Sequence, residues 1–279
     1  MSDWRYQSAH DLGLSGRERH RSVQRETTLL DSGLRLLWQA YVRIVLKTWN
    51  RMAIRGLENL PKQPPFVLVA NHTSHLDAIV LSSILPWRWR NEVSPLAAGD
   101  YFFSSLAVSE FSAGVLNALP IWRERQRGQR HELADLRGRL INQSAIYIVF
   151  PEGTRSRDGE LHTFKPGFAT LVAGTSIPIV PCHLDGNSTA FPPDKYFLRP
   201  HKITLHVGRP MTFETVSNHA SGWREIARVV QQETERLRSL CIREKRRRRH
   251  AFHMAPRTVE KLKRFARNVE AELAGGKRV

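Results

Sequence analysis

The sequence has few cysteines and no long apolar run, and both absences narrow the classes of protein it can belong to. Its two cysteines, Cys182 and Cys241, lie far apart in the chain. Isolated cysteines form neither a disulfide framework nor a metal-binding cluster, which suits a reducing compartment. No stretch reaches the roughly 18 uninterrupted apolar residues of a membrane-spanning helix, and residues 1–13 lack the apolar core of a secretory signal. We therefore expect that the chain does not cross a membrane.

Acidic residues are also scarce relative to basic ones. The 279 residues include 43 Lys and Arg but only 26 Asp and Glu, so the formal net charge is +17. Such a surface attracts phosphates on nucleic acid, on anionic lipid or on small substrates, and charge alone does not choose among them. The basic run at residues 243–249 suits a nucleic-acid backbone and a lipid surface equally. Because no nucleic-acid-binding module is recognised elsewhere, we expect no specific nucleic-acid partner.

Strand and helix signals alternate through the middle of the chain. Short apolar runs of the buried-strand type occur at 66–70 and 145–150, and residues 202–207 alternate like a half-exposed strand. A further strand begins at 177–181, where prolines favour an edge or a strand end. Helical stretches are expected at residues 78–85 and 223–240. These signals predict an α/β fold: a single domain with a mixed, largely parallel sheet flanked by helices, plus an N-terminal amphipathic helix and a basic C-terminal extension.

The N-terminal helix is predicted over residues 34–52. Its apolar residues recur at spacings of three and four, and a polar stripe runs along another side. The stripe consists of Arg35, Gln39, Arg43, Lys47 and Arg51. One interpretation packs the helix on the domain with its charged side in solvent. The other lays it in the plane of a membrane, with Trp38, Tyr41 and Trp49 at the headgroup level. Both interpretations can hold together.

Polar residues crowd the turn after the first strand, where the sequence reads NHTSHLD from Asn71 to Asp77. The carboxyl end of a strand in an open α/β sheet is the usual place for chemistry. Asp77 in the first helical turn would hold His72 in one tautomer, so that His72 takes a proton from an attacking hydroxyl. The structural alternative is a capping box of Ser74 and Asp77, with His72 a turn residue. No serine or cysteine in a nucleophile-elbow context lies nearby, which favours attack by the substrate itself.

A second apolar strand runs directly into FPEGTRSR, residues 150–157. A glycine beside a threonine and an arginine exposes backbone N–H groups next to a guanidinium, a combination that suits a phosphate. Glu152 would pair with Arg155 or accept a hydrogen bond from a substrate hydroxyl. Lys165, within FKPG, adds another cation close by in sequence. The structural alternative is a surface turn whose charges are solvated.

Together these motifs resemble the glycerolipid acyltransferase family typified by bacterial 1-acylglycerol-3-phosphate acyltransferase. The family's first block, NHxSxxD, reads NHTSHLD at 71–77, and its third, FPEGTRS, is present unchanged at 150–156. The fourth, an apolar strand with proline, is matched at 177–181. The second, a glycine followed by a short apolar stretch and an arginine, is matched more loosely between Gly114 and Arg123. The resemblance covers roughly residues 50–215, and four blocks in the family's order argue against coincidence.

The resemblance implies a role for each matching residue. His72 would be the general base and Asp77 its orienting partner. The residues that would bind the acceptor phosphate, or support that site, are Arg123, Glu152, Gly153, Thr154, Arg155 and Lys165. No metal ligand is implied, and His75 takes no role from the family. The implied division of the chain is a polar segment at 1–30, an amphipathic membrane-associating helix at 31–55, an acyltransferase domain at 56–240 and a basic extension at 241–279.

The implied activity is transfer of a fatty acyl group from acyl-CoA or acyl-carrier protein to the free hydroxyl of 1-acylglycerol-3-phosphate. No cofactor is expected, because the acyl donor is a co-substrate. The expected partners are a membrane surface with anionic lipids, the lysophospholipid acceptor and the acyl donor. The expected location is the cytoplasmic face of a membrane, as a peripheral or monotopic protein. The alternatives are another lysolipid or a glycolipid as acceptor, or a non-catalytic basic protein that binds membranes or nucleic acid.

Overall fold

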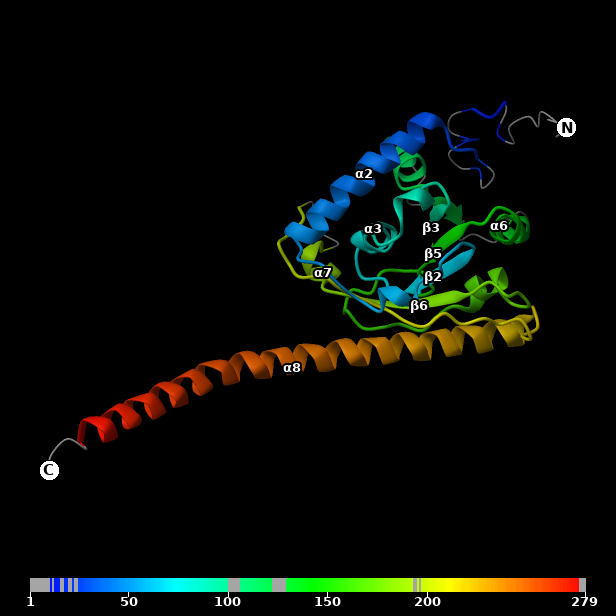
Figure 1. Ribbon diagram of the computed structural model, residues 1–279. Coiled ribbons are helices and arrows are strands. Elements are labelled where there is room, and N and C mark those ends of the chain that lie inside the picture. Colours follow the sequence, from blue (N-terminus) through cyan, green and yellow to red (C-terminus); the bar gives the residue numbers. More distant parts are fainter. Residues whose placement is uncertain are drawn as a thin grey trace, which may run out of the picture. The chain divides into compact units, whose positions relative to one another are not determined.

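A computed structural model of the protein describes residues 11, 13–15, 18–19, 22, 25–99, 106–121, 129–192, 195 and 197–275, with the backbone alone at 106–107, 129–132 and 249–275. The chain divides into two compact units, Met1–Leu237 and Arg238–Val279. The first unit contains the sheet and the helices that cover it (Figure 1). The motifs identified from the sequence all lie in this first unit.

In its described residues the first unit is built on a seven-stranded sheet with the order β1-β7-β6-β2-β5-β3-β4. Its strands are β1 Ala53–Arg55, β2 Phe66–Ala70, β3 Val93–Ala98, β4 Leu119–Ile121, β5 Ile146–Val149, β6 Ile179–Asp185 and β7 Thr204–Val207. Among these described strands every pairing is parallel except β6 with β7, which is antiparallel. The predicted mixed, largely parallel sheet is therefore confirmed.

Helices cover both faces of this sheet because its central strands are apolar on both sides. The helical elements of the first unit are α2 Leu29–Thr48, η1 Leu57–Asn59, α3 Leu76–Ser83, η2 Trp87–Trp89, α5 Leu106–Glu110, η3 Phe111–Val115, α6 Gln129–Asn142, η4 Pro166–Leu171, α7 Asn187–Ala190 and the first part of α8 Ala220–Gly275. Val67 and Val69 of β2 pack with residues of α6, η4 and α8. Phe66 and Leu68 pack with residues of α2, α3 and α7 on the other face.

Strand β6 lies inside the sheet, between β7 and β2, so the expected edge position is wrong. Pro181 is in register with Val69 of β2, and its carbonyl accepts the N–H of Gly208 at 2.7 Å. The ladder with β7 starts only at the next pair, Cys182 with Val207. The nitrogen of Pro181, which has no N–H to donate, therefore faces a position beyond the end of β7. No hydrogen bond of the β6–β7 ladder is lost there, so this interior strand tolerates the proline.

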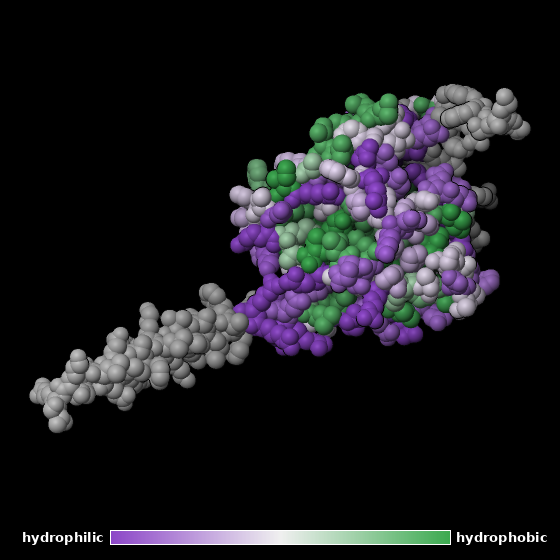
Figure 2. Space-filling model, in the orientation of Figure 1, coloured by the Kyte–Doolittle hydropathy of each residue, from purple (hydrophilic) through white to green (hydrophobic). Residues whose placement is uncertain are grey.

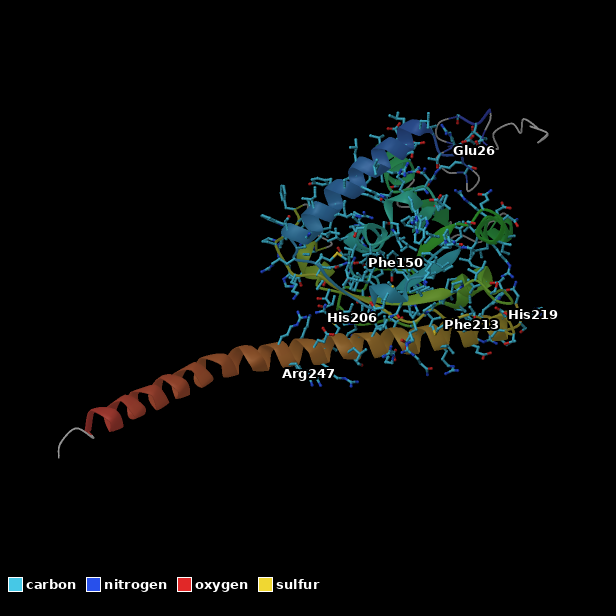
Figure 3. All side chains as sticks on the ribbon, in the orientation of Figure 1. Glu26, Phe150, His206, Phe213, His219 and Arg247 are labelled. Carbon is cyan, nitrogen blue, oxygen red and sulfur yellow. The ribbon has the colours of Figure 1, made fainter. Side chains whose placement is uncertain are left out.

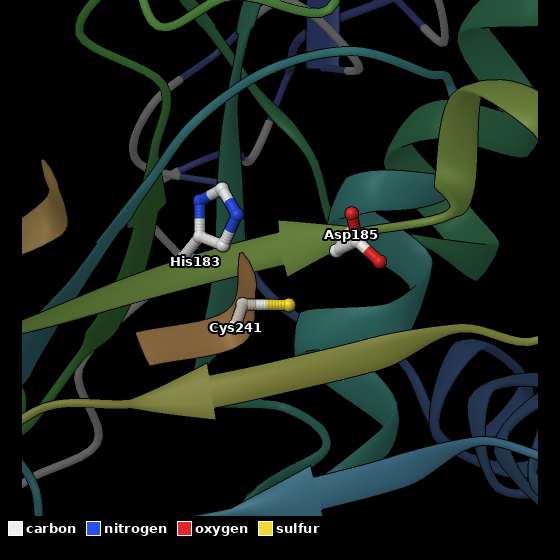
Figure 4. Close-up of side chains that lie close together, drawn as sticks. All are labelled: His183, Asp185 and Cys241. Carbon is white, nitrogen blue, oxygen red and sulfur yellow. The ribbon is translucent and has the colours of Figure 1, made fainter. Parts of the chain in front are cut away.

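Strand β7 is buried along its whole length instead of half exposed. Thr204 and His206 are buried like Leu205 between them, because β7 lies between β1 and β6 in a sheet that is covered on both faces. In the antiparallel ladder His206 is in register with His183, and Thr204 with Asp185. A close-up shows His183 and Asp185 along β6, which continues into α7 (Figure 4).

Helix α2 begins at a capping box of Thr28 and Asp31, which lies before the predicted start of the helix. The Oγ1 atom of Thr28 accepts the N–H of Asp31 at 3.1 Å, and the Asp31 carboxylate accepts the N–H of Thr28 at 3.0 Å. This reciprocal pair satisfies two donors that a helix start would otherwise leave unpaired. The helix predicted over 34–52 is therefore displaced toward the N-terminus, to Leu29–Thr48.

Much of the polar stripe of α2 packs inward, on the domain. Arg35 is 2% exposed and donates to the carbonyl of Gly114 at 2.7 Å, while Arg43 donates to the carbonyl of Ser83 at 2.8 Å. Gln39 is buried as well. Burial lowers the pKa of Arg35 to about 10. The interpretation in which the charged side of this helix is solvated is therefore wrong at these positions. Main-chain carbonyls of neighbouring turns replace water as the hydrogen-bond acceptors of the two arginines.

The outward side of α2 is apolar. The exposed residues Leu30, Leu34, Leu37, Tyr41 and Ile44 form what we call the apolar face of α2. Figure 2 shows hydrophobic residues gathered over the helix that Figure 1 labels α2. No helix in the described part of the chain is long and apolar enough to span a bilayer.

The second unit consists of the continuation of α8 from Arg238 to Gly275, followed by residues outside the described part. The predicted basic extension is therefore helical up to Gly275. The basic side chains at its start are solvent-exposed: Arg243, Lys245, Arg246, Arg247 and Arg248. Arg248 lies 3.7 Å from Glu244, a pair of surface type that contributes little stability.

Candidate active site

Two adjacent parallel strands bring the two polar motifs of the sequence to one edge of the sheet. β2 leads into NHTSHLD and β5 leads into FPEGTRSR, and Val69 of β2 is in register with Val149 of β5. Because the carboxyl ends of parallel strands meet at one edge, the two loops leave the sheet side by side. β6, the other neighbour of β2, also ends at this edge and supplies α7.

His72 and Asp77 form a hydrogen-bonded pair. The His72 Nδ1 atom lies 2.9 Å from Asp77 Oδ2. The aspartate side chain is 0% exposed, whereas the imidazole is 19% exposed. The ring of Phe150, labelled in Figure 3, stacks on the imidazole with a centroid distance of 4.2 Å. Because Nδ1 is hydrogen-bonded to the carboxylate, Nε2 is the ring nitrogen that can accept the proton of a substrate hydroxyl.

Asp77 also holds together the turn that leads into α3, but this helix is not capped by the box of Ser74 and Asp77 that was the structural alternative. Its Oδ2 atom accepts the main-chain N–H of Thr73 at 2.6 Å and of Ser74 at 2.8 Å. Ser74 is not the N-cap that the sequence suggested, because α3 begins at Leu76 and His75 occupies the cap position. The Ser74 hydroxyl oxygen accepts the N–H of Leu76 at 3.2 Å, and the hydroxyl donates to the carbonyl of Phe191 at 2.7 Å.

A fourth donor to Asp77 was missed from the sequence. Asn187, the first residue of α7, donates from Nδ2 to Asp77 Oδ1 at 2.7 Å, and both side chains are fully buried. It lies 110 residues away in the sequence, so no local spacing links it to Asp77. The only signal was a polar residue, after Gly186, at the end of an apolar strand. Asn187 fixes the carboxylate oxygen that does not contact His72.

Main-chain hydrogen bonds tie the two motif loops together. Glu152 Oε1 accepts the N–H of His72 at 2.9 Å, and the N–H of Ser156 donates to the carbonyl of His72 at 2.8 Å. Burial raises the pKa of Glu152. One of the two contacts expected for Glu152 from the sequence was a pairing with Arg155. In the structure the buried Glu152 carboxylate instead contacts the backbone of His72, the candidate base.

The cations of the predicted anion site lie on the same pair of loops. Arg155 contacts the ring of His75 in the neighbouring loop through NH1. Gly153 has a φ of 74°, and a Cβ atom added there would stand 2.8 Å from Lys165 Nζ, so the ammonium lies against this glycine. Thr154 is exposed. Arg123, the remaining predicted phosphate ligand, lies outside the described residues.

The arrangement places a carboxylate-braced imidazole next to a loop that carries a guanidinium and an ammonium. An imidazole with a free Nε2 suits removal of a proton from a hydroxyl. Arginine and lysine beside a glycine turn suit binding of a phosphate. Within the described residues of the first unit alone, no three His, Cys, Asp or Glu side chains converge closely enough to hold a metal ion.

Comparison with known proteins agrees with the motifs. Residues 51–185 match the model of a family described as Acyltransferase. The chain is 34% identical over 163 residues to the chloroplastic 1-acyl-sn-glycerol-3-phosphate acyltransferase BAT2 of Brassica napus, covering 56% of this chain and 42% of that protein. It is 32% identical over 132 residues to 1-acyl-sn-glycerol-3-phosphate acyltransferase alpha of Homo sapiens, covering 47% and 44%. The match thus spans less than half of each relative.

A solved structure shares the fold. The crystal structure of the 1-acyl-sn-glycerophosphate acyltransferase PlsC from Thermotoga maritima aligns with a TM-score of 0.52 and 22% identity, over 72% of this chain and 80% of that one. At this identity the likeness shows the fold alone. Together with the family match, it confirms the resemblance to glycerolipid acyltransferases that was drawn from the motifs.

Proposed function

We propose that this chain, whose residues 51–185 match the Acyltransferase family, transfers a fatty acyl group from a thioester to the free hydroxyl of 1-acylglycerol-3-phosphate. The observation that carries the proposal is the contact of 2.9 Å between the partly exposed His72 and the buried Asp77, directly beside the loop that holds Arg155. The names of the relatives support this acceptor. Another lysolipid or a glycolipid remains the alternative, and the acyl donor is acyl-CoA or acyl-carrier protein.

The reaction follows from the order of the groups. The acceptor phosphate binds at Arg155 and the glycine turn at Gly153, with Lys165 alongside. This places the acceptor hydroxyl at His72 Nε2, which takes its proton as the oxygen attacks the thioester carbonyl. A tetrahedral oxyanion forms, the C–S bond then breaks, and the thiolate leaves with the proton that His72 returns. Asp77 stabilises the imidazolium between the two proton transfers.

The first test removes the base. His72→Ala should lower kcat by about 10²- to 10⁴-fold, the usual contribution of a general base, in an assay of thiol release from acyl-CoA with 1-acylglycerol-3-phosphate. The matched control is His162→Ala, because that ring lies on the neighbouring loop and faces Asp158 at 3.2 Å. The control should keep the kcat of the unaltered protein. Near-normal turnover by His72→Ala would reject the mechanism.

The second test identifies the acceptor. Purified protein is incubated with labelled acyl-CoA and a panel of lysolipids, glycolipids and glycerol 3-phosphate, and the lipid products are separated. We expect 1-acylglycerol-3-phosphate to be acylated most efficiently, and Arg155→Ala to weaken this preference by raising the KM for the phosphate-bearing acceptor. Efficient acylation of a phosphate-free acceptor, unaffected by Arg155→Ala, would favour the alternative.

The protein is further proposed to lie on the cytoplasmic face of a membrane, as a peripheral protein held by the apolar face of α2. That face is exposed, with 72% of Leu30 and 70% of Leu37 accessible to solvent. The acceptor and the product of the proposed reaction are membrane lipids. A protein surface that enters the headgroup region would therefore bring the active site to its substrate. The exposed basic residues at the start of the second unit would add attraction to anionic headgroups.

Vesicle flotation tests this placement. Leu37→Glu combined with Ile44→Glu removes about 1–2 kcal/mol of apolar transfer per residue, which corresponds to binding weaker by about 30- to 1000-fold. The control is Ile141→Glu, an exposed apolar residue of α6. Helix α6 packs against the opposite face of the sheet. Equal loss of binding in the control and the double variant would remove α2 from the proposal.

A further inference from the structure

His75 occupies a position of the first motif to which the family resemblance assigns no role. It is the N-cap residue of α3, three residues after His72, and its ring is half-buried at the site. Its Nε2 atom contacts NH1 of Arg155, which comes from the other motif loop 80 residues away. The contact therefore joins the loop of the candidate base to the cation that we assign to the acceptor phosphate.

The chemistry of this contact fixes which partner donates. A guanidinium has only N–H donors, so the imidazole must accept through an unprotonated Nε2 and carry its single proton on Nδ1. Burial and the neighbouring Arg155 lower the pKa of His75 to about 4, with a smaller contribution from His72, while Asp77 acts in the opposite direction. The ring is therefore neutral near pH 7, in the form that accepts a hydrogen bond.

From this geometry we propose that His75 is a positioning residue for Arg155 and thereby sets the affinity of the enzyme for the phosphate of its acceptor. The inference rests on the proposed function, because it assumes that Arg155 binds that phosphate. A free arginine side chain samples many rotamers, and ordering it costs conformational entropy. Because the five N–H donors of a guanidinium lie in one plane, holding one of them directs the others.

This role separates His75 from His72. The histidine at position 72 would handle the proton of the reaction, whereas His75 would touch neither the hydroxyl nor the thioester. Loss of His75 should therefore weaken binding of a phosphate-bearing acceptor and leave the acyl donor unaffected. A merely structural role would lower stability and affect both substrates alike.

The experiment uses the full chain with acyl-CoA and two acceptors, 1-acylglycerol-3-phosphate and the same monoacylglycerol without phosphate. We expect His75→Ala to raise the KM for the phosphate-bearing acceptor about tenfold, the loss of one hydrogen bond to a charged group. The KM for acyl-CoA and the rate on monoacylglycerol should stay unchanged. His75→Gln should restore the KM, because a glutamine carbonyl reaches about as far as Nε2. His162→Ala is the matched control.

A double-mutant cycle with Arg155→Ala decides whether His75 acts through Arg155. The double variant should bind the acceptor no worse than Arg155→Ala alone. Additive losses, a raised KM for acyl-CoA, or an equal loss on monoacylglycerol would overturn the inference. If His75→Ala fails to fold, the comparison of His75→Gln with His75→Leu replaces it, and equal KM values in those two would overturn it as well.

The same measurements separate the two proposals. A protein that acylates neither acceptor nor any other lysolipid refutes the proposed function. A protein that acylates 1-acylglycerol-3-phosphate with the same KM before and after His75→Ala refutes only the role of His75. An active protein whose KM is insensitive to Arg155→Ala also refutes it, because Arg155 would then not hold the phosphate.

Discussion

Replacing Asn187 by alanine tests whether the brace of Asp77 acts on catalysis or only on folding. In the structure the Asn187 amide donates to Asp77 Oδ1 at 2.7 Å, while the other donors to this carboxylate, from His72, Thr73 and Ser74, all approach Oδ2. Without Asn187 the carboxylate is held on one oxygen alone. It is then able to turn about its terminal bond and carry Oδ2 away from the imidazole.

The size of the effect follows from burial. Both side chains are fully buried, so water does not replace the lost donor. A hydrogen bond to a charged group contributes about 1.5–3 kcal/mol. If that energy is expressed in the orientation of His72, kcat of Asn187→Ala falls by about 10- to 150-fold, at 1.36 kcal/mol for each factor of ten. The free energy of unfolding falls by a similar amount.

Asn50 provides a closely matched control. It is also fully buried, and in the described structure the Oδ1 atoms of both asparagines have no hydrogen-bond partner. Its amide donates to the carbonyls of Arg199 at 2.9 Å and His201 at 3.0 Å, remote in sequence from the motifs. Asn50→Ala should destabilise the fold by about 1–3 kcal/mol and leave kcat per folded molecule unchanged.

The assay pairs urea unfolding with steady-state kinetics at matched folded fractions. We expect similar losses of unfolding free energy in the two variants and a loss of kcat in Asn187→Ala alone. Equal kcat in both variants, with equal stability, would show that Oδ2 keeps its place without Asn187. The role of the second brace would then be purely structural.

Three further predictions concern other contacts. Arg35→Ala should lower the free energy of unfolding, measured by chemical denaturation, by about 2–4 kcal/mol, because the carbonyls that accept from buried Arg35 lose their donor. The control Lys47→Ala, at an exposed position of the same helix, should change it by less than about 0.5 kcal/mol. Gly153→Ala should raise the acceptor KM, because φ is 74° and the added Cβ displaces Lys165. Burial and Arg155 lower the pKa of His75 from 6.5 to about 4, so between these pH values the unfolded chain binds a proton that the folded chain does not, and stability falls as pH drops. Denaturation at several pH values should show a smaller loss across this window in His75→Gln.

The sequence predicted the parts of the fold and site in which the signal is local. The two strands that carry the motifs are apolar runs long enough to identify, and they pair in parallel within the largely parallel sheet that was predicted. The proximity of His72 and Asp77 followed from five residues across a strand-to-helix turn. The predicted mixed, largely parallel sheet rests on these local signals and matches the structure.

Features that depend on distant partners were missed. β1, β3 and β4 have three to six residues each and carry weak patterns, and pairing with their neighbours stabilises them in the sheet. Asn187 reaches Asp77 only because β6 ends beside β2. The orientation of α2 could not be read from periodicity, because an amphipathic pattern does not say which side faces the domain. Buried Arg35 required carbonyl acceptors from η3 that no local spacing reveals.

The hydrogen bonds exchanged between the two motif loops have a consequence for protein engineering. Since the backbone of His72 is bound on one side by Glu152 and on the other by Ser156, neither loop can be transplanted into a related scaffold alone. A chimera that imports NHTSHLD without FPEGTRS would carry the imidazole on an unsupported turn. Shuffling experiments should therefore exchange the two segments as a single cassette, and directed evolution of acceptor choice should vary positions beyond it.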